Sequence, residues 1–130
     1  MDNTALLCVA SLGLLLFGLG LAVSALRFRE GTGSGHSSDP ADLLHKVIRA
    51  HGNTAQFAPF LAVLFLYFGA RNPSTAIVSM MVGATACRFL SVIGLIAWPT
   101  MAKPNPVRFI GALGTYLLGA GLSIALLFGG

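Results

Sequence analysis

Long apolar runs alternate with short polar connections along the whole chain. The runs cover residues 5–26, 41–69, 75–97 and 107–128, and each holds the roughly 20 residues that an α-helix needs to cross a hydrocarbon core. Helices satisfy their own backbone hydrogen bonds in lipid, and runs of this length without strict alternation favour them. The pattern therefore predicts an all-α integral membrane protein, a four-helix bundle that forms a single domain over residues 1–130.

The first connection ends in a helix-start signal. Residues 31–38 are rich in Gly and Ser, which favours a flexible segment. Asp39 followed by Pro40 is typical of a helix start, so the second helix is expected to begin there and to run to about Gly69. A helix of that length exceeds a hydrocarbon core of about 30 Å. Its polar first half must therefore project beyond the membrane or face other protein.

The composition agrees with a membrane location. Of the 130 residues, 55% are hydrophobic and 9% are charged, and the mean hydropathy is +0.82, outside the usual composition of soluble domains. The formal net charge of +4 raises the question of a nucleic-acid partner, but the cations are scattered over loops and helix ends without interleaved aromatic residues. Cys8 and Cys87 lie within apolar runs, where a free cysteine behaves as a small hydrophobic residue, so no disulfide framework is predicted.

The distribution of positive charge predicts the orientation in the membrane. The second connection has only Arg71, whereas the first and third connections and the helix ends beside them hold more cations. These are Arg27, Arg29, Lys46, Lys103 and Arg108. Because Lys and Arg favour cytoplasmic loops, both termini are expected outside and these two connections inside. A cleaved signal peptide at 5–26 is the competing interpretation, which the length of the apolar run and the lack of an N-terminal cation disfavour.

A polar stripe runs along the first half of the second helix. At 100° per residue, its members fall within a sector of roughly 80°. They are Asp42, Lys46, Arg49, Asn53 and Gln56. Because an uncompensated polar group in lipid costs several kcal/mol, the stripe is expected to face the bundle, a subunit boundary or a wet cavity. His51 points to the opposite face and is expected to be structural.

Other arginines are expected at a similar depth. Arg88 lies in the third helix, Arg108 at the start of the fourth, and Arg27 at the end of the first. None of them has an obvious carboxylate at its own depth, because the acids are confined to Asp2 and to the two ends of the first connection. Unmatched positive charge of this kind predicts a ligand that carries its own negative charge. For Arg27 and Arg108, an alternative is that their side chains reach lipid phosphates at the interface.

The stripe contains a recognisable motif. Arg49-Ala50-His51-x-Asn53-x-x-Gln56-x-x-Pro59 resembles the signature of the MAPEG family, the membrane-associated proteins in eicosanoid and glutathione metabolism. Supporting marks occur in every helix, so the resemblance covers essentially the whole chain. They are Arg27-Phe28-Arg29, Ser38-Asp39-Pro40, Asn72-Pro73, Arg88 and Asn105-Pro106-Val107-Arg108.

The resemblance implies a homotrimer of four-helix bundles that binds glutathione between subunits near the cytoplasmic side. It implies that Arg108 is catalytic and stabilises the glutathione thiolate, for attack on a lipophilic electrophile or reduction of a lipid hydroperoxide. The residues that it implies for glutathione binding are Arg27, Arg49, Asn53, Gln56 and Arg88. The expected member is a bacterial-type microsomal glutathione transferase that serves detoxification in the inner membrane, with periplasmic termini.

Departures from the family pattern separate the possible functions. Gln56 stands where the family usually has Glu, which removes a charge that could pair with the glutathione ammonium. Leu95 and Ala112 stand where prostaglandin E synthase members have tyrosines, so eicosanoid synthesis is disfavoured. One alternative is a trimer that binds glutathione or lipid without catalysis. A small multidrug-type transporter is a weaker alternative, because the apolar parts of the predicted helices lack Asp and Glu.

A metal site is not expected. The histidines are His36, His45 and His51, and no two of them have the i, i+3 or i+4 spacing that converges on an ion.

Overall fold

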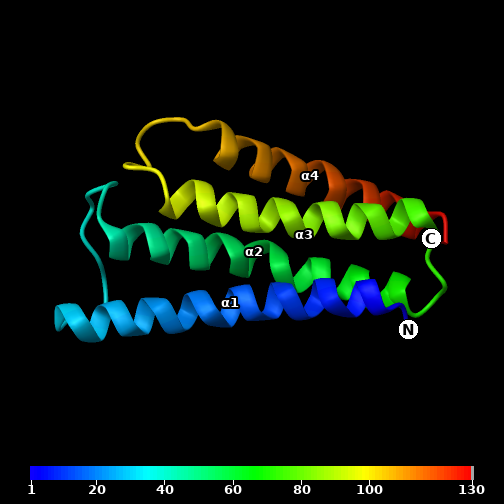
Figure 1. Ribbon diagram of the computed structural model, residues 1–130, viewed down its shortest axis with the longest axis horizontal. Helices are drawn as coiled ribbons and strands as arrows, with labels where there is room; N and C mark the ends of the chain where they lie inside the picture. Colours follow the sequence, from blue (N-terminus) through cyan, green and yellow to red (C-terminus); the bar gives the residue numbers. More distant parts are fainter. Residues whose placement is uncertain (130) are drawn as a thin grey trace.

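Four helices form an antiparallel bundle in the computed structural model, which describes residues 1–129 (Figure 1). They are α1 (Asn3–Glu30), α2 (Leu43–Gly69), α3 (Thr75–Ile96) and α4 (Pro106–Leu127). No strand occurs within the described range. Both termini lie at one end of the bundle, and the first and third connections lie at the other, which we call the loop end (Figure 1). The expected all-α fold and the shared side of the termini are confirmed.

Polar side chains cap the N-terminus of every helix. Asp2, Asp42, Ser74 and Asn105 each accept a hydrogen bond from a free backbone N–H of the first turn. Caps of this type stabilise a helix by about 1 kcal/mol.

The predicted start of α2 was too early. Asp39 accepts a hydrogen bond from the N–H of Ala41 at 2.9 Å and so closes a turn rather than opening the helix. Asp42 has an extended backbone and caps α2 through the N–H of His45 at 3.0 Å. Two aspartates three residues apart offer the same capping chemistry, so the sequence alone does not choose between them.

Three helices, α1, α3 and α4, are long and apolar enough to cross a membrane by length and composition. The polar residues in the first half of α2 keep it outside that group. α2 also contains Pro59, which has no N–H for the helical ladder, and its ribbon bends part-way along its length (Figure 1).

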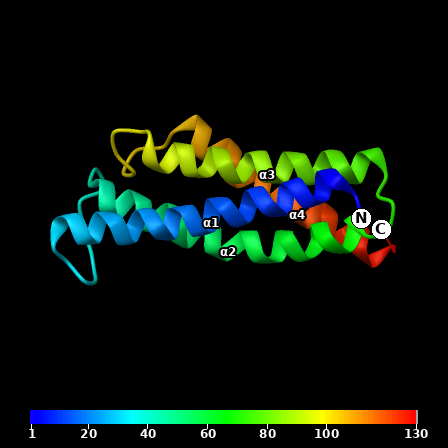
Figure 2. The ribbon, with the colours of Figure 1, turned by 60° about the horizontal axis from the view of Figure 1, so that its bottom comes forward.

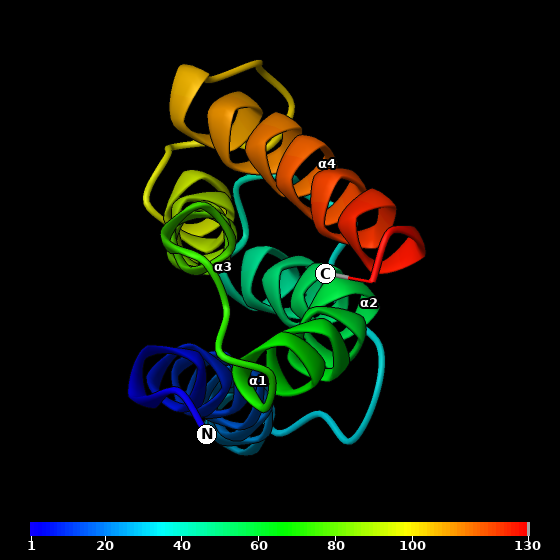
Figure 3. The ribbon, with the colours of Figure 1, turned by 90° about the vertical axis from the view of Figure 1, so that its right-hand side faces the viewer.

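The helices pack mainly as two pairs, α1 with α2 and α3 with α4 (Figure 2). Glycines bring the second pair very close: a Cβ on Gly94 would lie 2.6 Å from the backbone N of Arg108, and one on Gly111 would lie 2.6 Å from that of Ser91. The predicted packing role of the glycines in the fourth helix is therefore confirmed at Gly111. Seen from the end, α4 starts beside α3 and slants toward the side of α2, with which it makes few contacts (Figure 3).

A polar layer separates two apolar clusters inside the bundle. The cluster near the termini includes Leu12, Leu64, Phe65, Met81 and Leu122, and the cluster near the loop end includes Leu19, Leu44, Val47, Val92 and Leu95. Along α2 and α3, every buried polar residue except Lys46 comes between the two. With Thr115 of α4, they are Thr54, Thr85, Arg88 and Ser91. This layer is where the fold gathers groups that lipid would not accept.

Candidate functional site

The guanidinium of Arg88 lies at the centre of the polar layer. The residue is 1% exposed, and its side chain bonds to three helices. Nε donates to Oγ1 of Thr115 at 3.0 Å, Nη2 donates to Oγ of Ser91 at 3.0 Å, and Nη1 donates to Oδ1 and the backbone O of Asn53 at 2.7 and 3.3 Å. Arg88 therefore joins α3 to α2 and α4.

Neutral oxygen atoms, not carboxylates, surround this buried cation. The acids of the chain are Asp2, Glu30, Asp39 and Asp42, all at helix ends or in the first connection. A charge taken out of water without a counter-ion needs well-placed hydrogen bonds. The hydroxyl of Thr115 donates to the carbonyl of Gly111 at 2.7 Å, and this hydrogen bond orients its lone pairs toward Arg88.

An apolar groove between α2 and α4 adjoins this cluster. Its volume is about 290 Å³, close to the lower end of the range for small-molecule sites. Two of its lining residues also contact the cation: Thr115 accepts the hydrogen bond from Arg88, and the ring of Phe57 lies 4.7 Å from the Arg88 guanidinium. The lining also includes Gln56, Phe60, Leu61, Tyr116, Gly119, Ala120 and Ser123.

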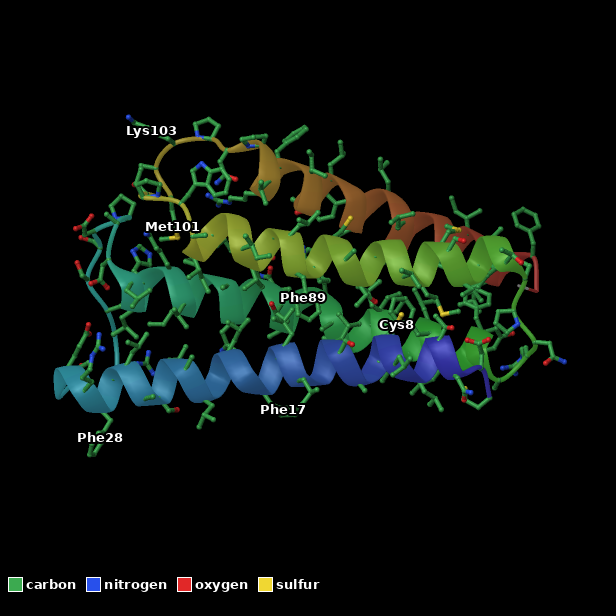
Figure 4. All side chains as sticks on the ribbon, viewed as in Figure 1. Cys8, Phe17, Phe28, Phe89, Met101 and Lys103 are labelled. Carbon is green, nitrogen blue, oxygen red and sulfur yellow. The ribbon has the colours of Figure 1, made fainter. Side chains whose placement is uncertain are left out.

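Arg108 lies in a second groove at the loop end, of about 330 Å³. Its Nη1 donates to the carbonyl of Met101 at 3.2 Å, the one hydrogen bond that its guanidinium makes within residues 1–129. Met101 turns toward the bundle, whereas Lys103 points away from it (Figure 4). Four of the five guanidinium N–H groups of Arg108 are thus unused by the described chain.

The other predicted arginines also lie toward the loop end of their helices. Arg27 is half-buried, and its Nε is shielded from solvent without a hydrogen-bond partner. Arg49 is exposed on α2, one turn before Asn53. His51 faces α1, where its Nε2 would lie 3.2 Å from a Cβ on Gly20. The expectation that His51 points away from the polar stripe is confirmed.

The structure brings only part of the predicted site into direct contact. Asn53 and Arg88 are hydrogen-bonded, and Gln56 lines the groove beside them. Arg27, Arg49 and Arg108 make no hydrogen bond to Asn53 or Gln56 in the described part of the chain. The sequence analysis missed Thr115, although it lies seven residues after Arg108 and so on the same helix face.

The remaining reactive side chains do not gather. Among residues 1–129, no group of three or more His, Cys, Asp or Glu side chains is placed to hold a metal ion. Cys8 and Cys87 are free thiols. His36 and His45 stack with ring centroids 4.2 Å apart, a contact that their spacing did not predict.

Comparison with protein-family models gives one match over nearly the whole chain. The model described as the MAPEG family matches residues 5–128. Comparisons with curated proteins and with solved structures gave no match.

Proposed function

The chain belongs to the MAPEG family, and we propose on this basis that it is a membrane-bound glutathione transferase. It conjugates glutathione to lipophilic electrophiles or reduces lipid hydroperoxides. The observation that carries the proposal is a set of arginines toward the loop end, Arg27, Arg49 and Arg108, whose guanidinium groups have donors to spare.

The residues fit glutathione, which carries two carboxylates and one ammonium. Arg27 has a shielded Nε without a partner, and Arg49 is exposed on the polar side of α2. Guanidinium groups bind carboxylates through paired N–H donors, so these two arginines hold the acidic ends. The side-chain carbonyl of Gln56 is a neutral acceptor for the ammonium, and it binds less strongly than the carboxylate of Glu would.

Arg108 supplies the positive charge beside the reacting sulfur. A nearby cation favours a thiolate over a thiol, and the free donors of Arg108 hold that thiolate in place. What glutathione contributes is the nucleophile: its sulfur forms a C–S bond with an electrophilic carbon as the leaving group departs with the bonding electrons. Arg88 positions the site by holding Asn53, and the groove between α2 and α4 admits an apolar substrate from the bilayer.

The membrane setting follows from the same reasoning. The protein is an integral membrane protein. We place it in a bacterial inner membrane as a homotrimer, with periplasmic termini and with the loop end, and hence the site, toward the cytoplasm. The support is the excess of Lys and Arg at the loop end together with family membership.

Conjugation by the purified protein in detergent tests the proposal. With glutathione and a chlorinated nitrobenzene, the wild-type protein should form the conjugate. Arg108→Ala should lower kcat about 100-fold, the scale of removing one group that stabilises a reacting anion. Arg71→Ala is the matched control, because Arg71 is exposed at the opposite end of the bundle and should keep the full rate. An equal rate in Arg108→Ala would refute the catalytic role.

The second candidate is a trimer that binds glutathione or lipid without catalysis. The amide at Gln56 in place of a carboxylate favours it, because the site then lacks an acid for the ammonium. In that case glutathione would raise the melting temperature of the protein, and neither electrophiles nor hydroperoxides would be turned over.

A further inference from the structure

A buried lysine ties α2 to the connection between α3 and α4. Lys46 is 7% exposed, and its Nζ donates to the backbone O of Trp98 at 2.7 Å, across 52 residues of sequence. Lys46 lies between Leu44 and Val47, which belong to the apolar cluster near the loop end. A lysine ammonium in such surroundings loses most of its hydration, and a peptide carbonyl replaces part of it.

No acid explains the burial of Lys46. The carboxylate nearest in sequence is Asp42, one turn earlier, and it accepts from the backbone N–H of His45 as the cap of α2. The hydrogen bond that Lys46 makes within the described residues goes to the loop. The Lys46 ammonium therefore helps to hold the loop of residues 97–105 in place.

A second hydrogen bond fixes the same loop to the chain just before α2. The N–H of Met101 donates to the carbonyl of Pro40 at 3.0 Å, in the connection before α2. The Met101 side chain also packs against the apolar cluster near the loop end. Two attachments thus hold the loop on the start of α2.

The loop in turn holds Arg108. The carbonyl of Met101 accepts from Nη1 of Arg108 at 3.2 Å, so one peptide residue links Pro40 to that guanidinium. Asn105, which is 4% exposed, accepts from the Arg108 N–H at 2.7 Å and donates to the carbonyl of Gly94 at 3.0 Å. Asn105 fixes the start of α4, whereas Met101 fixes the end of the Arg108 side chain.

We propose that Lys46 is a positioning residue that sets the Arg108 guanidinium through the loop 97–105. This inference rests on the proposed function, in which Arg108 holds the glutathione thiolate. Lys46 itself touches neither glutathione nor the substrate. Its charge matters because a charged donor strengthens the hydrogen bond that anchors the Trp98 carbonyl.

The loop contact is tested first, without any assay of activity. Trp98 is the one tryptophan of the chain, so its fluorescence reports on the loop directly. Lys46→Met should increase quenching of Trp98 by acrylamide and raise the hydrogen-exchange rate of the Met101 amide at least tenfold. Lys46→Arg, which retains a donor, should keep both close to wild type.

Folding of the variant is checked in the same samples. Amides in the middle of α3 and in the second half of α2 should keep their protection in Lys46→Met, which would show that only the loop end has loosened. Unchanged fluorescence quenching and Met101 exchange in Lys46→Met would overturn the proposal.

Kinetics then tests positioning. With Arg108 displaced, the thiol binds its proton more tightly, so the rise of kcat/KM with pH should move to higher pH in Lys46→Met. At neutral pH kcat should fall about tenfold with little change in the KM for glutathione, because Arg27 and Arg49 still hold the carboxylates. Lys46→Arg should restore the profile.

The outcomes separate this inference from the proposed function. A loosened loop with an unshifted pH profile and full kcat would overturn the positioning role while leaving transferase activity intact. A loosened loop in Lys46→Met together with an inactive wild type would refute the transferase proposal while supporting the anchoring of the loop by Lys46.

Discussion

Arg88 and Arg108 have the same side chain, but the protein satisfies the hydrogen-bond donors of the first and leaves most of those of the second unused. Arg88 lies in the middle of the bundle and donates four hydrogen bonds to α2, α3 and α4. Arg108 lies at the loop end and donates one side-chain hydrogen bond, to a loop carbonyl. Counting the donors that the protein itself satisfies therefore distinguishes an arginine that holds the helices together from one that is available to a ligand.

The difference also concerns what each position tolerates. One partner of Arg88 is itself oriented by a further hydrogen bond, because Thr115 donates to the Gly111 carbonyl. The partner of Arg108 is a backbone carbonyl in a loop whose position depends on Lys46 and Pro40. We expect substitutions at Arg88 to act on stability first and those at Arg108 to act on chemistry first.

Arg88→Ala should have the largest effect on stability. It would leave the buried Ser91 and Thr115 and the half-buried Asn53 without their donor and would open a cavity, at a total cost of about 3 kcal/mol or more. Thermal unfolding in detergent measures the loss. Arg71→Ala is the exposed control and should change stability by about 1 kcal/mol or less, because it removes one exposed hydrogen bond and one stack on the Tyr67 ring. Equal melting temperatures for the two variants would remove the distinction between the two kinds of arginine.

Arg108→Ala should show the reverse pattern. The expected 100-fold loss of kcat corresponds to about 2.7 kcal/mol in the transition state. The loss of folding stability should be about 1 kcal/mol or less, because one hydrogen bond to a carbonyl is removed. Thermal unfolding of the sample used for kinetics checks this. A melting temperature as low as that of Arg88→Ala would contradict the separation.

Gly111→Ala tests the close contact that lets α4 reach Arg88. A Cβ at this position would meet the Ser91 backbone at 2.6 Å, so the helices must move apart at a cost of about 1–3 kcal/mol. Thermal unfolding should register that loss. Gly13→Ala is the matched control, because nothing lies within 4 Å of a Cβ there, and it should be neutral or slightly stabilising.

Thr115→Val removes one acceptor of the Arg88 cluster, together with the bond from Thr115 to the Gly111 carbonyl, and changes the size of the side chain little. The variant removes an acceptor from Arg88, and we expect a loss of about 1–2 kcal/mol by thermal unfolding. Ser123→Ala removes a hydroxyl on the same helix that bonds only to the Gly119 carbonyl and should cost less. A larger loss of stability in Ser123→Ala than in Thr115→Val would contradict a stabilising role for the bond between Arg88 and Thr115.

Gln56→Glu should have the smallest effect and act on binding alone. Arg88 is already satisfied, so a carboxylate in the adjoining groove is available to the glutathione ammonium. We expect glutathione affinity to rise about three- to tenfold, or roughly 1 kcal/mol, by calorimetry. Gln56→Leu, which removes the acceptor, should lower it. Weaker binding by the Glu variant would mean that the new carboxylate pairs with Arg88 instead.

Local rules predicted most of the fold. The apolar runs located every helix, and the period of 3.6 residues assigned His51 and Asn53 to different faces. The exception among helix starts was α2, where Asp39 and Asp42 offer the same cap. Short-range signals fail when two neighbours carry the same chemistry.

The contacts of the candidate site were less predictable, because they join residues far apart in sequence. Periodicity placed Lys46 in the polar stripe, but its ammonium ends on a carbonyl 52 residues away. Thr115 was overlooked because a threonine in an apolar helix is common. Its role depends on the Arg88 side chain, which comes from another helix and donates to it. Such pairs depend on how α3 and α4 approach each other, which the glycines permit but do not specify.

The acceptors of Arg88 also bear on how the protein is inserted during synthesis. A nascent α3 alone in lipid would carry one bare cation near its middle, which costs about 2.5–3.5 kcal/mol on insertion scales. Asn53 is made before α3, whereas Thr115 is made after it. The hairpin of α2 and α3 can thus shelter the charge while α4 is still being made, and the hydroxyl that arrives last completes the set.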